Sequence, residues 1–367
     1  MKKHLRAIIT LIVIGLMCKG VSSVMGLANM FNTIMNTSYD LLMNTVFYIM
    51  AIAVVTGAFA SILSYTGVID LIDVIISPLM RPVYGLPGAA SLGIISTFFS
   101  DNPAIITLIK DKGFTKHFKP YELPCLCNLG TSFGMGFVVW VFMGGQGNGG
   151  EFMTAASIGV LGAVIGSVVS TRITLSLTRK KYQADCASII KEDGEEGKGV
   201  SKTFLDAALD GGARGAEIGA QIIPGVLVIC TFVMLLIGHP SESGAYTGAA
   251  FEGIDIMQYM GAGFFKVFKF LFGFTALDDL AFPLTALGSV GASLSLVPHL
   301  IETGKAAGNE IAVFTAMGMC WSGYLSTHVA MMDSIGVRKL AKPSIISHTI
   351  GGLCAGCAAH ILFTLFG

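Results

Sequence analysis

Charged side chains are scarce in this sequence. Asp, Glu, Lys and Arg make up 13% of its 367 residues, whereas a soluble domain carries about 25%. Lys and Arg together (23) equal Asp and Glu together (23), so no excess of positive charge indicates a nucleic-acid partner. Hydrophobic residues make up 53% of the chain, and the mean hydropathy is +0.73. This composition excludes a soluble domain and indicates a protein of the lipid bilayer.

Recognisable catalytic and metal-binding motifs are lacking as well. The sequence contains no P-loop, no nucleophile elbow and no zinc signature. The run Gly145-x-Gly147-x-x-Gly150 matches a dinucleotide fingerprint only formally, because no strand–helix unit surrounds it. Most of the 8 cysteines lie in apolar stretches, where a thiol is usually a small apolar residue. We therefore expect a protein that is not an enzyme, with no cofactor and no metal site.

Long apolar runs dominate the sequence. A membrane-spanning helix takes about 20 mostly apolar residues. Seven stretches meet this length: Leu5–Ala28, Met43–Leu63, Leu123–Gly144, Phe152–Leu177, Gly219–Gly238, Glu310–Met332 and Ile345–Phe366. Two further apolar stretches, Gly88–Ile109 and Phe270–Pro298, carry acidic residues and proline near their centres. These two predict interrupted segments and not simple spans.

The distribution of Lys and Arg predicts which connections face the cytoplasm. The basic residues among the first six place the N-terminus inside, ahead of a helix that we expect to be retained and not removed as a signal peptide. Arg81 and Lys110 flank Gly88–Ile109, so both ends of that stretch lie inside and it forms a re-entrant hairpin. The connection 239–255 lacks Lys and Arg. By the same reasoning Phe270–Pro298 is a hairpin that enters from the outer side.

The two halves of the chain repeat one pattern. Residues 43–178 and 217–367 each contain a span, a short amphipathic helix, a hairpin (88–109 or 270–298) and two more spans. Residues 1–42 are expected to form an N-terminal helix and an outer loop, and residues 179–216 a cytoplasmic linker. We predict an all-α polytopic protein of a bacterial inner membrane, with about seven spans and two re-entrant hairpins in an inverted-topology repeat. Such repeats are typical of secondary transporters.

Polar side chains gather in the first hairpin and in the spans that follow the two hairpins. Asp101 and Asn102 precede Pro103, a residue that breaks helices. An ionisable group at membrane depth lines a cavity or has a partner, so Asp101 binds a solute, caps the following helix, or does both. The other candidate solute-binding residues, which could equally bond to neighbouring helices, are Asn128, Thr131, Ser132, Ser322, Thr327 and His328.

Asp278 and Asp279 are expected at the equivalent place in the second hairpin. Two adjacent ionised carboxylates repel each other in apolar surroundings. We therefore expect one acid to cap a helix and the other to hold a cation or a proton, as a coupling-ion site for Na⁺ or H⁺. The alternative is an exposed turn in which both acids are solvated.

Two motifs resemble the gate (nucleoside-recognition) domain superfamily. They are the break Ser100-Asp101-Asn102-Pro103 within residues 96–112, and Ile222-Ile223-Pro224-Gly225 at the entry to a span. The superfamily includes concentrative nucleoside transporters, the membrane domains of ferrous-iron permeases and spore-maturation membrane proteins. The resemblance covers most of residues 43–367 in two copies, and it implies paired re-entrant hairpins and interrupted helices.

Together these features predict an ion-coupled secondary transporter of a small polar solute. Nucleosides and nucleobases are the leading candidates for that solute. The first alternative is a metal or inorganic-ion permease, and the second is a membrane scaffold that transports nothing. The expected partners are the solute and the lipid bilayer, with no nucleic acid, and the sequence leaves the formation of a homo-oligomer open.

Overall fold

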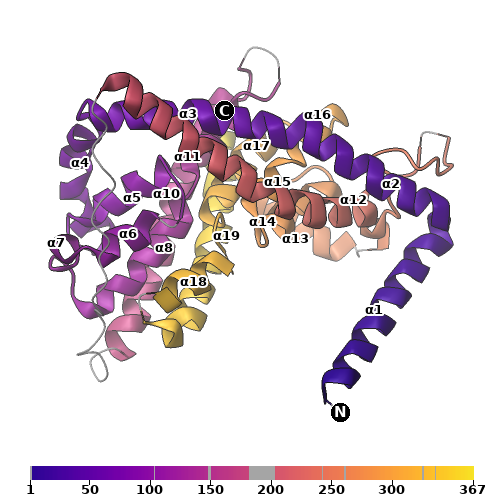
Figure 1. The fold of residues 1–367 in the computed structure, drawn as a ribbon, viewed down its shortest axis with the longest axis horizontal. Coiled ribbons are helices and arrows are strands. Elements are labelled where there is room, and N and C mark those ends of the chain that lie inside the picture. The colour runs from indigo at the N-terminus through magenta and orange to yellow at the C-terminus, as the bar shows by residue number, and fades with distance from the viewer. Residues whose placement is uncertain are drawn as a thin grey trace.

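The structure, a computed structural model, describes residues 2–102, 104–147, 150–181, 203–241, 243–259, 262–324, 326–334 and 336–367. These residues form helices and turns, with no strand among them (Figure 1). The α-helices in chain order are α1 (Lys2–Met25), α2 (Leu27–Asp40), α3 (Phe47–Tyr65), α4 (Val68–Leu79), α5 (Ala90–Phe98), α6 (Ala104–Lys110), α7 (Lys112–Thr115), α8 (Leu123–Phe133), α9 (Gly136–Gly144), α10 (Met153–Lys181), α11 (Phe204–Gly225), α12 (Thr231–Ile237), α13 (Ala262–Phe272), α14 (Ala281–Ala286), α15 (Val290–Leu294), α16 (Val297–Glu302), α17 (Gly308–Cys320), α18 (Ser326–Ser334) and α19 (Ala341–Phe366). The all-α class predicted from the sequence is confirmed.

Six helical segments within the described residues are long and apolar enough to cross a membrane. They are His4–Met25, Leu27–Tyr65, Pro120–Gly144, Met153–Arg179, Phe204–Ile237 and Arg338–Phe366. Each corresponds to one of the seven predicted spans. The seventh, Glu310–Met332, is divided after Cys320 into α17 and α18, which lie further apart along the chain than α8 and α9 do within Pro120–Gly144.

The helix interruptions occur at matching places in the two halves. In the first half α8 and α9 are separated at Gly134 and Met135, and Met135 has a left-handed backbone with a φ of 57°. In the second half the corresponding helices α17 and α18 are separated at residues 321–325. Helices in equivalent positions also contact one another, because α3 packs on α11, α8 on α17 and α10 on α19. The order of elements thus follows the predicted repeat, and the opposite orientation of its two copies stays a prediction.

A pair of buried glutamates begins the two equivalent helices in the same way. Glu122 Oε2 accepts a hydrogen bond from the backbone N–H of Lys119, at 2.8 Å. Glu310 Oε2 accepts one from the N–H of Ala307, at 3.1 Å. Each carboxylate thereby satisfies a backbone donor that the helix itself leaves unpaired. The shared cap shows that the two halves resemble each other in local detail as well as in helix order.

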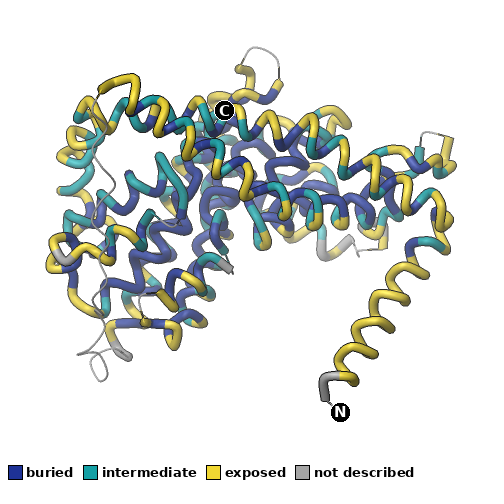
Figure 2. Tube along the Cα trace, in the orientation of Figure 1, coloured by how far each residue is buried: buried dark blue, intermediate teal, exposed yellow. Residues whose placement is uncertain are grey.

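The interior of the molecule is built around α8 and α17. Every residue of α8 is buried, and so is α17 from Glu310 to Cys320. Both helices contact α10 and α19. The N-terminal helix α1 is exposed along most of its length and extends away from the rest of the chain (Figure 2). Its apolar side chains are therefore available to lipid.

Three boundaries differ from those expected from the sequence. Residues 27–40, expected to lie largely in an outer loop, form α2. Helix α11 begins at Phe204, inside the segment 179–216 expected to be a linker, and Thr203 caps it by accepting a hydrogen bond from the N–H of Asp206. The central part of that linker, 182–202, lies outside the described residues. The third difference concerns the second hairpin.

The second hairpin turns later than expected. Asp278 and Asp279 lie in the short 3₁₀ segment η7 (Leu277–Leu280), ahead of α14. The turn between the two packed helices of the hairpin, α14 and α15, is formed by residues 287–289. Asp279 Oδ2 accepts the N–H groups of Thr275 and Ala276 at 3.1 and 2.9 Å. The acids therefore mark the start of the hairpin, because a carboxylate is favoured where a helix begins.

Close packing of α3 against α11 depends on glycine. The two helices run side by side (Figure 1) and extend through most of their length in contact. A β-carbon added at Gly211 or Gly215 would collide with the backbone of α3 at Gly57 or Ala53. Small residues at such crossings let two membrane helices approach each other closely.

Replacing one of these glycines tests the packing. Gly215→Ala is expected to destabilise the protein by about 1–3 kcal/mol, because the added methyl group forces α3 and α11 apart. Gly212→Ala on the same helix is the matched control, since its β-carbon would lie 3.5 Å from Val54 Cγ1, an ordinary contact. The measurement is the apparent melting temperature of both variants in detergent. Equal melting temperatures for the two would contradict the close approach.

Candidate functional site

A pocket forms where the interruptions of both halves come together. Its volume is about 130 Å³. It is bounded by the turn of each hairpin, by the break in each equivalent helix pair, and by one face of α11. The lining residues are Asp101, Asn102, Met135, Ile218, Gln221, Ile222, Ser289, Val290, Gly291, Ser322 and Thr327.

Asn102 links the first hairpin to the two broken helices. Ser322 Oγ lies 2.9 Å from Asn102 Oδ1 and 2.9 Å from the carbonyl oxygen of Thr131, so its hydroxyl can donate to either. A β-carbon at Gly134 or at Gly323 would collide with the Asn102 side chain. The glycines at both breaks therefore make room for this amide. The consequence is a polar junction between the hairpin turn, α8 and the start of the α17–α18 break.

Asp101 is the acidic residue of the described pocket lining. Its side chain is partly buried, and Oδ1 accepts the backbone N–H of Asn102 at 2.7 Å. The other polar side chains that line the pocket are amides and hydroxyls, and no Lys or Arg occurs among the described lining residues. A neutral or cationic solute is therefore compatible with this lining. An anionic solute would lie near the Asp101 carboxyl group and would find no Lys or Arg among the described lining residues to pair with. Pro103, which follows this turn, lies outside the described residues.

Four of the eight predicted solute-binding residues line the pocket, and four do not. Asp101, Asn102, Ser322 and Thr327 line it. The other four are buried between helices: Asn128, Thr131, Ser132 and His328. The structure therefore divides the predicted residues into a group that faces the pocket and a group behind it.

Asn128 bonds to neighbouring helices. Its Nδ2 lies 2.7 Å from both Ser170 Oγ and Thr174 Oγ1 of α10, and 3.4 Å from Ser347 Oγ of α19. Its backbone carbonyl accepts the hydroxyl of Ser132 at 2.7 Å. These contacts match the alternative in which polar groups bond one membrane helix to another.

His328 lies behind the pocket with a second histidine. Its Nδ1 is 3.4 Å from Thr131 Oγ1, and its ring meets that of His348 edge to face with centroids 5.2 Å apart. Both imidazoles are fully buried. A role for His328 in binding a solute stays a prediction.

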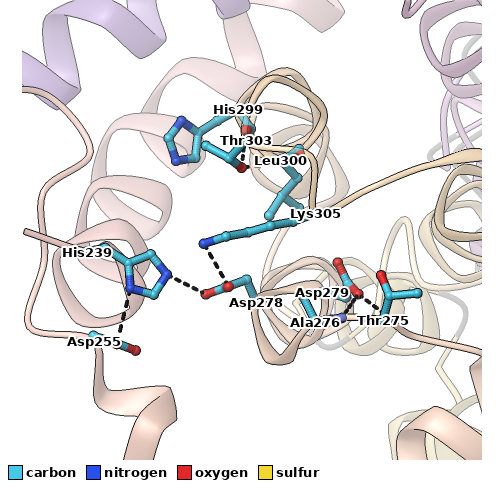
Figure 3. A network of polar contacts seen from close by, with 10 residues as sticks. All are labelled: His239, Asp255, Thr275, Ala276, Asp278, Asp279, His299, Leu300, Thr303 and Lys305. Atoms are coloured by element: carbon cyan, nitrogen blue, oxygen red, sulfur yellow. Dashed lines mark hydrogen bonds and ion pairs between the residues drawn. The ribbon is translucent and has the colours of Figure 1, made fainter. Parts of the chain in front are cut away.

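Asp278 and Asp279 lie away from the pocket lining. Asp278 Oδ2 is 2.8 Å from Lys305 Nζ, and Asp278 Oδ1 is 3.4 Å from His239 Nε2 (Figure 3). Lys305 runs against the positive-inside bias of the predicted topology, and this ion pair gives it a local counter-charge. Asp279 caps its own helix, as described above. A coupling-ion role for the two acids stays a prediction.

Seven of the eleven lining residues were not predicted from the sequence: Met135, Ile218, Gln221, Ile222, Ser289, Val290 and Gly291. Gln221 is the single amide in the predicted span Gly219–Gly238. A lone amide in an apolar run is a signal that could have identified it as a site residue. Ser289 follows Gly288, a turn residue, at the true turn of the second hairpin, and its hydroxyl accepts the N–H of Ala292 at 3.2 Å. Met135 is apolar, and nothing in its side chain distinguishes it from a core methionine.

Substituting the two asparagines separates the pocket from the helix bundle behind it. Asn128→Ala is expected to lower stability by about 1–2 kcal/mol, because hydroxyls on α10 lose their amide partner. Asn102→Ala removes one bond at the edge of a cavity and is expected to cost less. The measurement is the melting temperature of each variant without any solute. A larger loss for Asn102→Ala than for Asn128→Ala would contradict this division.

Comparisons with known proteins agree with the helix arrangement. Residues 45–184 match the family model described as Gate, nucleoside recognition. No curated protein matches the sequence. The family match covers the first of the two predicted repeats, so the resemblance noted in the sequence is confirmed there at the level of the family.

Solved structures extend the likeness to almost the whole chain. The concentrative nucleoside transporter CNTnw in an inward-facing, substrate-bound state has a TM-score of 0.56 at 15% identity, over 97% of this chain and 86% of that one. A variant of CNTnw in an outward-facing state has a TM-score of 0.55 at 14% identity, over 99% and 86%. Identity at this level shows the fold alone. Residues 45–184 thus match the Gate (nucleoside recognition) family model, and almost the whole chain shares the fold of these transporter structures.

Proposed function

We propose that this membrane transporter is an ion-coupled secondary transporter that carries a small, neutral or cationic polar solute through the pocket. The observation that carries the proposal is that both hairpin turns and both helix breaks meet at one cavity. Nucleosides and nucleobases are the leading solutes, because the Gate domain bears the description of nucleoside recognition. The fold shared with CNTnw supports the same class.

The position of the pocket suits solute binding at membrane depth. An interrupted helix exposes backbone N–H and C=O groups that lipid cannot satisfy, so such breaks are tolerated only where they face protein or a water-filled cavity. Here the two breaks and two turns share one cavity, which can offer these groups to a polar guest. Amides and hydroxyls from four of the five segments that line the cavity can then fix the orientation of this guest.

The lining chemistry narrows the solute class. Asp101 is the single charged residue of the described lining, and Asn102 and Gln221 add amides that both donate and accept. This set matches hydroxyl and ring-nitrogen groups. An anionic solute such as a nucleotide would place its charge against Asp101 with no Lys or Arg to offset it. Discrimination against anions therefore follows from the proposal.

Transport requires the pocket to open. Its volume of about 130 Å³ is below the range of about 300–1,000 Å³ that ligand pockets usually occupy. The cavity is therefore too small, as arranged here, to admit a solute of nucleoside size without separation of its walls. The walls come from α11 on one side and from the hairpins and broken helices on the other. Motion between these two sides would enlarge the pocket.

A stability screen tests the solute class. Purified protein is heated with nucleosides, nucleobases, nucleotides or divalent cations, since a ligand that binds only the folded state stabilises it by about 2.7 kcal/mol at a hundred times its Kd. We expect a shift with nucleosides or nucleobases and none with nucleotides. A shift produced by divalent cations alone would instead favour a metal permease.

Charge removal at the pocket tests the site. Asp101→Asn is expected to lower the apparent affinity for the solute, measured from the thermal shift, at least tenfold. The variant protein should still insert into the membrane and purify. Asp70→Asn, at an exposed carboxylate of α4, is the matched control and should leave affinity unchanged. Equal affinities for both variants would reduce Asp101 to a helix cap.

Uptake under different gradients tests coupling. Proteoliposomes are given a Na⁺ gradient, a pH gradient or neither, and uptake of the solute from the screen is compared. One of the two gradients is expected to stimulate uptake. Asp279→Asn is expected to abolish this stimulation, while exchange of the solute across the membrane without a gradient persists. Equal uptake under the three conditions would mean facilitated diffusion.

A further inference from the structure

A segment that we name the strap, residues 239–259, follows α12 on the predicted outer side. It is bound to α2, because Asn29 Nδ2 donates to the carbonyl of Tyr246 at 3.0 Å and Asn36 Nδ2 to that of Gly248 at 2.8 Å. It also returns onto α12, where the N–H of Ile254 lies 3.0 Å from the carbonyl of Leu235. The strap thus belongs with α2 and α12.

A polar contact joins the strap to the second hairpin. His239 has a carboxylate at each ring nitrogen: Asp255 Oδ2 lies 3.1 Å from Nδ1, and Asp278 Oδ1 lies 3.4 Å from Nε2 (Figure 3). Asp255 is part of the strap, whereas Asp278 lies in η7 at the start of the hairpin. Lys305, which follows α16, contacts the other oxygen of Asp278. His239 therefore bridges two parts of the molecule.

A ring contact reinforces this bridge. Phe251 of the strap stacks on His299 of α16, with centroids 4.7 Å apart and planes inclined by 23°. Phe251 has a left-handed backbone, with a φ of 65°, and its N–H donates to Thr37 Oγ1 of α2 at 2.9 Å. The strap therefore reaches from α2 to the end of the second hairpin.

The contact between His239 and Asp278 lies across the same boundary as the pocket, namely the one between the α11–α12 segment and the second hairpin. Helix α11, which supplies Ile218, Gln221 and Ile222 to the pocket, continues through η5 (Val226–Cys230) into α12 and the strap. The opposite wall includes Ser289 of the second hairpin, which is continuous with η7 and α16. A motion that separates α11, η5 and α12 together from the second hairpin would therefore also separate His239 from Asp278.

We propose that His239 is a pH-sensitive latch on the pocket: in its protonated form it holds the strap to the second hairpin, and loss of the proton releases them. This inference rests on the proposed transport function, because only a transporter needs the boundary to open. Histidine changes charge between about pH 5 and 8. The latch is therefore expected to hold at the acidic end of this range.

The surrounding charges set the sign of the effect. Protonated His239 attracts both Asp255 and Asp278, whereas neutral His239 leaves the two carboxylates with Lys305 as the nearest cation. The groups that face this cluster or lie within electrostatic range of it are Asp255, Glu252 and Tyr246 of the strap, Asp278 and Asp279 of η7, His299 of α16, Lys305 after it, and Asp40 of α2. Glu252 already accepts hydrogen bonds from Thr247 and Gly248 within the strap.

The expected size of the effect is moderate. The His239 side chain is 42% exposed, so water screens its ion pairs and each is weak. We expect the ratio of latched to released molecules to change by about two- to fivefold across the histidine range. That is enough to bias a transport cycle without locking it.

A distance measurement tests the latch without any solute. Spin labels are attached to Ala245→Cys in the strap and Glu302→Cys in α16, both exposed positions. The full-length protein carries Ser in place of its eight native cysteines and is reconstituted in lipid. The distance distribution is recorded near pH 5.5 and near pH 8. A shorter distance is expected to dominate at the lower pH, and a longer one to gain population at the higher pH.

Variants at His239 make the test specific. His239→Gln is neutral at both pH values and should show the high-pH distance distribution of the unsubstituted protein at both, whereas His239→Arg is charged at both and should keep the low-pH distribution. His117→Gln, at an exposed histidine elsewhere, should retain the full pH response. Distances that do not change with pH, or a response that survives His239→Gln, would overturn the latch. Neither result depends on finding the solute, so a failure of the transport proposal would be seen separately.

Discussion

A chain in a bilayer must satisfy every backbone N–H and C=O group without help from water, and this constraint governs the architecture here. Most helices meet it by being continuous. Among the interruptions in the described residues, the two hairpin turns and the two helix breaks meet at the cavity that contains Asp101 and Asn102. Because residues 134 and 323 are glycines, the Asn102 side chain reaches both breaks. Its amide therefore lies where lipid could not satisfy the backbone groups that the breaks expose. The interruptions therefore define the site, and the remaining helices hold them together.

The pocket also divides the molecule into two sides. Helix α11, packed through Gly211 and Gly215 on α3, forms one wall. The hairpins and broken helices, anchored on α10 and α19, form the other. The strap and its contact at His239 lie across the same division, at a distance from the pocket along the chain. A transporter of this design would be controlled where the two sides touch, and the polar groups at those contacts would set the conditions under which it opens.

Simple sequence rules predicted much of the fold because the bilayer imposes them strongly. Hydrophobic length located six of the helical segments, and basic residues around Gly88–Ile109 identified the first hairpin. Asp278 and Asp279 gave a wrong position for the turn of the second hairpin, because an acid pair can start a helix as well as mark a turn. The packing of α14 on α15 places that turn at Ser289. Asn128 and Gln221 carry the same amide, yet one bonds α10 and the other faces the cavity. One sequence cannot distinguish these roles, since they depend on which way each helix face is turned.

The central claim is that a single cavity, reached alternately from the two sides of the membrane, binds the solute. Ser289→Cys, in a background with the native cysteines replaced, places a thiol at the pocket, and Ala245→Cys places one on the strap as a control. The rate of labelling by a membrane-impermeant thiol reagent is measured from each side of sealed vesicles, with and without the solute. The account predicts labelling of Ser289→Cys from both sides and slower labelling when solute is bound, with no such protection of Ala245→Cys. Labelling of Ser289→Cys from one side only, or at a rate that the solute does not change, would contradict it.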